Sequence, residues 1–86
     1  MVIKGDKHIM EKDIMNMLKE IKPEADFSSS NDFAEDGLLD SIDIVSLISM
    51  IEEKYNIVID GLDLLPENFA SVETIKKLMI KSGAKE

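Results

Sequence analysis

The feature that most constrains the fold is the helical spacing of apolar side chains in three stretches of the chain. A helix that lies on a core shows apolar residues every three or four positions, which together form one stripe. Residues 6–21, 41–55 and 71–83 show this spacing. The stripes contain Met10, Ile14, Met17, Leu18 and Ile21; Ile44, Leu47, Ile48, Ile51 and Tyr55; and Val72, Ile75, Leu78 and Met79. The pattern predicts an all-α protein.

Residues that favour helix ends lie at the limits of these three segments. Asp6 is a candidate N-cap of the first helix, and Pro23 disfavours helical backbone at Lys22, so the first helix should end there. Side chains of Asp and Ser cap helix N-termini, and Gly commonly follows a helix C-terminus. The corresponding residues of the other two helices are Asp40 or Ser41, Ser71 and Gly83.

The segment between the first two helices, residues 23–39, has no sustained period and contains the turn-forming run 28–32. A loop of this length in a small domain needs contacts that hold it. We expect its four large apolar residues to pin it to the core, and Gly37 to supply a backbone angle that other residues resist. These apolar residues are Phe27, Phe33, Leu38 and Leu39.

The segment from Asn56 to Ala70 connects the second and third helices. Its β-branched run 57–59 has no partner strand, so we expect an extended connector with Ile57 and Ile59 packed inward. One short helical turn is expected around residues 62–67, with Leu62, Leu65 and Phe69 facing the core. The sequence therefore predicts a single domain over residues 1–86, a small antiparallel four-helix bundle with three main helices, one short helix and a long first loop.

Composition limits what such a domain does. The chain is 86 residues long, 44% hydrophobic and 33% charged, as expected for a soluble globular protein. It has no cysteine, which excludes disulfides, thiolate nucleophiles and thiolate metal sites. No apolar run approaches the ~20 residues that span a membrane. The N-terminus shows no secretory h-region. We expect a cytoplasmic protein, monomeric by default.

The net charge of −8 is unevenly distributed. Residues 23–53 contain nine acidic residues and no lysine or arginine, whereas the rest of the chain carries a net charge of +1. Such a field repels nucleic acid and anionic membranes and steers association with basic protein surfaces. A solubilising face is the alternative interpretation. The concentration of acids around Ser41 favours a docking surface.

Ser41 stands where the long loop becomes the second helix. At such a junction the hydroxyl faces solvent, beside backbone N–H groups that have no intrahelical partner. These groups and the helix dipole favour a negatively charged group. The position therefore suits a phosphate ester.

Other chemistry is poorly supported. His8 is the only histidine and is distant in sequence from Ser41, so no Ser/His/Asp triad can be assembled. Calcium-loop spacing fails from both Asp36 and Asp60. The sequence thus predicts neither a catalytic residue nor a metal site, and it disfavours an enzyme.

Three motifs, taken in their order and spacing, resemble the acyl carrier protein family, which includes the peptidyl and D-alanyl carrier proteins. They are GLLDSI at 37–42, EEKYNI at 52–57 and PENFASVETI at 66–75. The resemblance is firm from about Phe33 to Met79 and looser over the first helix. Within the family the residue after the serine is most often Leu, where this chain has Ile42.

The resemblance implies a carrier rather than an enzyme. Ser41, preceded by Asp40, would bear 4′-phosphopantetheine taken from coenzyme A, whose thiol holds acyl or aminoacyl groups as thioesters. Implied partners are a phosphopantetheinyl transferase, a loading ligase or acyltransferase, and downstream synthases. The family's second helix is its main recognition element. The recognition residues carried over are Asp40, Ile42, Asp43, Val45, Glu52 and Glu53.

The resemblance leaves the pathway open among fatty-acid, polyketide, peptide and D-alanyl transfer. Fatty-acid carriers usually have an acid where Ser46 stands and a larger apolar residue where Ser49 stands. The GLLDS approach is more similar to the D-alanyl and peptidyl branches, or to stand-alone carriers of biosynthetic clusters. The alternative function is an acidic helical interaction module that binds a basic protein partner and bears no arm.

Overall fold

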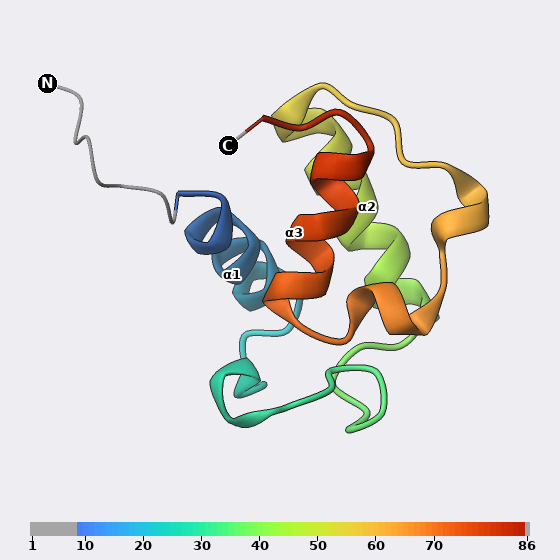
Figure 1. The fold of residues 1–86 in the computed structure, drawn as a ribbon. Coiled ribbons are helices and arrows are strands. Elements are labelled where there is room, and N and C mark those ends of the chain that lie inside the picture. Colours follow the sequence, from blue (N-terminus) through green and yellow to red (C-terminus); the bar gives the residue numbers. More distant parts are fainter. Residues whose placement is uncertain (1–8, 86) are drawn as a thin grey trace, which may run out of the picture.

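Three α-helices and three short 3-10 helices make up the computed structural model, which describes residues 9–85 (Figure 1). The α-helices are α1 (Ile9–Ile21), α2 (Ser41–Tyr55) and α3 (Val72–Lys81), and α1 packs against both others. The 3-10 helices are η1 (Phe27–Ser29), η2 (Gly61–Asp63) and η3 (Pro66–Phe69). The described residues contain no strand. The predicted all-α class is confirmed.

Local sequence signals fixed the helix ends as expected. The first helix stops at Ile21, two residues before Pro23, while its expected N-cap Asp6 lies outside the described residues, as does His8. The second helix spans the predicted residues 41–55. In the third, the Ser71 hydroxyl accepts the Thr74 amide at 3.1 Å. Past its end Gly83 has φ +114°, a left-handed angle that favours glycine.

One apolar core lies between the helices. It contains the predicted stripes together with Phe27, Phe33 and Leu39 of the long loop. The rings of Phe27 and Phe33 meet edge to face with centroids 5.0 Å apart, an arrangement that aromatic pairs favour. The loop is therefore pinned as expected, with Leu38 partly buried against the core. The connector is also as expected, since Ile59 is buried and Ile57 partly buried.

The expectation that Leu62 and Leu65 face the core is wrong. Leu62 is 84% exposed and Leu65 is also exposed, while Phe69 alone of the three is buried. Two 3-10 turns, η2 and η3, occupy the segment where one short helical turn was expected. Asp63 forms an ion pair with Lys81 of α3 at 2.9 Å, which turns this residue toward the bundle and Leu62 toward solvent. Polar contacts, which the apolar pattern does not show, thus decided the orientation.

None of the helices in the described part of the chain combines the length and apolar character that crossing a bilayer requires.

Candidate functional site

Ser41 is the first residue of α2, and its side chain is exposed. The residue before it, Asp40, is the N-cap, and its carboxylate accepts the backbone N–H of Asp43 at 2.8 Å. The Asp43 carboxylate in turn accepts the N–H of Asp40 at 3.1 Å, which completes a capping box. Two acids therefore cap the helix. The Ser41 hydroxyl takes no part in the cap and has no hydrogen-bond partner among residues 9–85.

The end of the long loop fixes the position of Ser41. The carbonyl of Phe33 accepts the N–H groups of Leu38 and Leu39 at 2.8 and 3.2 Å, and the Phe33 N–H donates to Ala70 at 2.7 Å. Gly37, within this turn, has φ +77°, which an L-residue adopts only with strain. Leu39, two residues before Ser41, is buried. The end of the loop is therefore anchored in the core, and this anchor holds Ser41 at the surface.

Backbone amides at the start of α2 suit an anionic group. The first N–H groups of a helix have no intrahelical partner, and the cap satisfies only the third of them, that of Asp43. Within the described residues the N–H groups of Ser41 and Ile42 have no acceptor, and they lie at the positive end of the helix dipole. The residues present thus fit a phosphate ester on the Ser41 hydroxyl.

A lysine that sequence analysis did not single out lies beside this helix end. The Lys22 ammonium forms an ion pair with the Asp43 carboxylate at 3.2 Å. The hydrogen bond to Asp43, with the charges of Asp43 and Asp40, raises the pKa of Lys22. Partial burial opposes ionisation of Asp43, but the N–H of Asp40 and the Lys22 ammonium together lower the pKa of this carboxyl below 3.8. Lys22 directly precedes the acidic stretch in sequence, the one signal that could have identified it.

The pKa of Asp43 gives a pH-dependence of stability. Because the folded pKa is below the unfolded value of 3.8, ionised Asp43 stabilises the fold above that value, and this contribution is lost as the pH falls through the folded pKa. We expect Asp43→Asn to lose less stability than wild type between about pH 7 and about pH 3, as measured by urea unfolding. Ser49→Ala, which leaves the capping box intact, should follow wild type. An equal loss in Asp43→Asn would exclude this contribution.

The predicted recognition residues fall into two groups along α2. Asp40, Ile42, Asp43 and Val45 surround Ser41 within the first turns, and Ile42 and Val45 are 76% and 58% exposed. Glu52 and Glu53 lie about 17 Å further along the helix axis, at 1.5 Å per residue. The Glu53 side chain is exposed, whereas the Glu52 carboxylate accepts the N–H of Ile59 at 2.9 Å. Glu52 is therefore partly committed to holding the connector.

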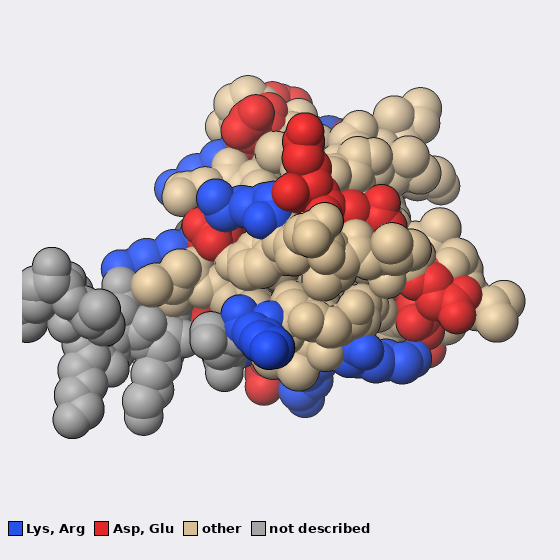
Figure 2. Space-filling view, turned by 90° about the horizontal axis from the view of Figure 1, so that it is seen from above, with Lys and Arg blue, Asp and Glu red and all other residues tan. Residues whose placement is uncertain are grey.

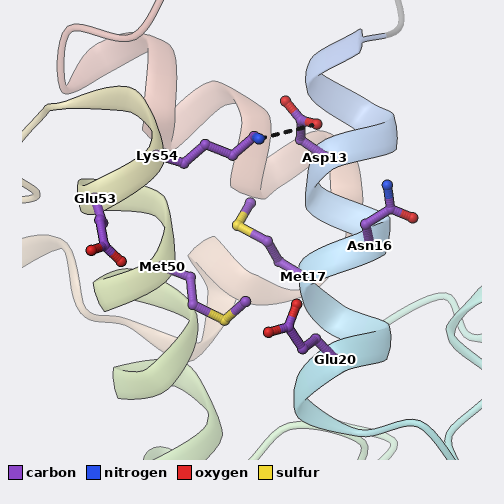
Figure 3. Close-up of a pocket in the computed structure, with 7 residues that line it drawn as sticks. All are labelled: Asp13, Asn16, Met17, Glu20, Met50, Glu53 and Lys54. Atoms are coloured by element: carbon purple, nitrogen blue, oxygen red, sulfur yellow. Dashed lines mark ion pairs between the residues drawn. The ribbon is translucent and has the colours of Figure 1, made fainter.

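A groove of about 390 Å³ lies between α1 and the C-terminal part of α2 (Figure 3). Across it the Lys54 ammonium lies 3.9 Å from the Asp13 carboxylate, which also accepts the Tyr55 hydroxyl at 2.5 Å. Burial, followed by the bond to Asp13, raises the pKa of Tyr55. The lining residues are Asp13, Asn16, Met17, Glu20, Met50, Glu53 and Lys54. Because these contacts join the two helices, we assign the groove a structural role.

The charges are distributed unevenly along the chain. The view from above, at the end opposite the start of α2, shows lysine side chains interspersed with acids (Figure 2). Residues 23–53, which include the long loop and most of α2, contain no lysine or arginine.

Within residues 9–85 no three His, Cys, Asp or Glu side chains group closely enough to hold a metal ion.

Comparison with known proteins identifies the family. A family model described as phosphopantetheine attachment site matches residues 12–79, which is most of the chain and includes Ser41. Searches of curated proteins and of solved structures gave no match. The chain therefore belongs to the phosphopantetheine attachment site family: it is a carrier protein that bears covalently attached 4′-phosphopantetheine, and not an enzyme.

Proposed function

We propose that Ser41 is the attachment residue and that the protein carries acyl or aminoacyl groups as thioesters to partner enzymes. The observation that supports this most is the exposed hydroxyl at the first position of α2, left out of the capping box formed by Asp40 and Asp43. When attached, the arm supplies a terminal thiol that holds the cargo. The carrier's own residues present the arm and bind the partners.

Attachment is a transfer of phosphopantetheine from coenzyme A. The Ser41 oxygen attacks the phosphorus on the pantetheine side of the coenzyme A diphosphate, and 3′,5′-adenosine diphosphate leaves. The hydroxyl proton passes to a base of the transferase. Recognition by that enzyme, rather than an activated serine, selects this hydroxyl among the exposed serines of the chain.

The added charge should change the stability of the fold little. An anion at a helix N-terminus is stabilised by about 0.3–1 kcal/mol when exposed. Repulsion from Asp40 and Asp43 acts in the opposite direction but is weakened by water and salt. The ion pair of Asp43 with Lys22 offsets part of that repulsion. Because these contributions to the free energy of folding are small and opposite in sign, the carrier is equally folded with and without the arm.

The surface around Ser41 suits basic partner enzymes. Ile42 and Val45 offer apolar contact, and Asp40, Asp43 and Glu53 offer negative charge. We infer that a phosphopantetheinyl transferase, a loading ligase or acyltransferase, and downstream synthases bind here in turn. The pathway is one of fatty-acid, polyketide, peptide or D-alanyl transfer, and we place it in the cytoplasm, where coenzyme A is present.

We also propose that residues 1–86 form a single domain. In this domain the 3-10 helix η3 takes the place of the short fourth helix of the bundle.

Intact-mass measurement tests the carrier function. After incubation with coenzyme A and a broad-specificity phosphopantetheinyl transferase, we expect the protein to gain the mass of one phosphopantetheine and no more. Free thiol should appear in equal amount, because the chain has no cysteine of its own. Protein that stays at its apo mass with several transferases would favour the arm-less interaction module.

A further inference from the structure

A lysine from outside the acidic stretch reaches the end of α2 that carries Ser41. Lys22 directly follows α1, and its ammonium lies 3.2 Å from the carboxylate of Asp43, two residues after Ser41. Residues 23–53 themselves contain nine acids and no lysine or arginine. The ion pair therefore brings a positive charge from the end of α1 to the start of α2, which lie at the same end of the bundle (Figure 1).

The backbone of Lys22 is held on both sides. Its N–H donates to the carbonyl of Leu18 at 2.9 Å, and its own carbonyl accepts the N–H of Ala25 at 3.1 Å. Leu18 has no exposed surface, so this turn is anchored in the core. Only the side chain of Lys22 must therefore be ordered to form the pair, which lowers the entropy cost of keeping the ammonium beside Asp43.

The charge of Asp43 is largely taken up inside the molecule. The same carboxylate oxygen, Oδ2, accepts the N–H of Asp40 at 3.1 Å and lies against the Lys22 ammonium. The Asp43 side chain is only 13% exposed, whereas that of Lys22 is 28% exposed. The two capping acids and Lys22 together carry a net charge of −1, where the two acids alone would carry −2. A basic surface that approaches this end of α2 is therefore attracted less strongly.

Lys22 lies on a flank of α2 that leaves the serine open. At 3.6 residues per turn, Asp43 is about 200° around the helix from Ser41, whereas Ile42 and Val45 are about 100° and about 40° from it. Ile42 and Val45 are exposed. The cation thus changes the charge near the hydroxyl without covering the hydroxyl or its apolar neighbours.

We propose that Lys22 is a charge-tuning residue of the attachment site: it partly cancels Asp43 and so weakens the attraction of basic partner enzymes to the start of α2. The proposal rests on the proposed function, in which such enzymes act at Ser41 in turn. A carrier that passes from one basic partner to the next must leave each of them, and a lower charge at the shared site favours exchange. Lys22 lies outside the GLLDSI motif, so the tuning belongs to this chain's own α1.

The test is steady-state modification at low salt by the phosphopantetheinyl transferase of the same organism, with coenzyme A. Lys22→Gln should lower the KM for the carrier about threefold, because a positive charge within a few ångströms of the partner's cations is removed. The kcat should not rise, and the gain should disappear at high salt. Lys19→Gln is the matched control: it makes the same change in net charge at an exposed residue in the last turn of α1, and its KM should stay close to wild type.

Titration of the Asp43 carboxyl carbon by NMR tests the pairing without the transferase. Lys22→Gln should raise the pKa of Asp43, because the ammonium that favours the carboxylate is gone, and Lys19→Gln should leave it as in wild type. Both variants should keep the helical circular dichroism of wild type, since neither side chain belongs to the core.

An unchanged or higher KM in Lys22→Gln overturns the proposal, as does an equal fall in Lys19→Gln, which would assign the effect to net charge alone. An Asp43 pKa that does not move when Lys22 is replaced overturns it as well. Wild type that is never modified on Ser41 contradicts the proposed function instead, and the tuning role falls with it.

Discussion

Ser41→Ala is expected to fold like the wild-type protein and to acquire no phosphopantetheine under any transferase treatment. The loss should be complete, because the ester needs the hydroxyl oxygen and alanine offers no substitute. The fold should be unaffected, because Asp40 and Asp43 cap α2 without the Ser41 side chain. Intact mass gives the modification state, and urea unfolding gives the stability of the same samples.

Ser46→Ala and Ser49→Ala are the matched controls. Both serines are exposed on α2, so they share the helix and the solvent access of Ser41 but not its position at the N-terminus. Each control should be modified as fully as wild type. Modification that persists in Ser41→Ala and disappears in one of the controls would assign the arm to that serine instead.

Phe69→Ala is expected to destabilise the fold by about 3–5 kcal/mol, the range found when a buried aromatic side chain is removed from a core. Phe69 has no exposed surface and stands at the end of η3, which packs on α3. Its loss leaves a cavity where η3 meets the core. A domain of this size has on the order of 5–15 kcal/mol of stability in total, so the variant should lose a large part of it.

Leu62→Ala is the control for Phe69→Ala, since it also shortens an apolar side chain in the α2–α3 connection. Because Leu62 is exposed, its truncation should change the free energy of unfolding by less than about 0.5 kcal/mol. Urea denaturation of the three proteins at one pH gives both differences. Equal losses for Phe69 and Leu62 would contradict the burial that separates them.

The helices could be predicted from sequence because their signals are local. The bounds of α2 follow from an acid at the N-cap and an apolar stripe that ends at Tyr55, and α3 begins after Ser71 for the same reason. The long loop could also be placed, because it contains Phe27 and Phe33, whose size requires burial. In these segments the residues at the helix ends and the apolar pattern predict the same structure.

The orientation of Leu62 and Leu65 in the α2–α3 connection could not be predicted, because the segment contacts α3 through a polar pair that is distant in sequence. Whether Leu62 or Asp63 faces the bundle depends on Lys81, eighteen residues away in sequence. The environment of Ser41 shows the same limit. Its position at the helix start could be predicted, but the ion pair of Lys22 with Asp43 joins residues on two elements. No periodicity in the sequence indicates that contact.

Peptide mapping of the protein purified from its own cells tests most directly whether Ser41 carries the arm. Proteolysis followed by tandem mass spectrometry should find 4′-phosphopantetheine, free or acylated, on the peptide that contains Ser41 and on that residue alone. Protein from those cells that never bears the arm, or bears it on another side chain, would contradict the assignment of Ser41.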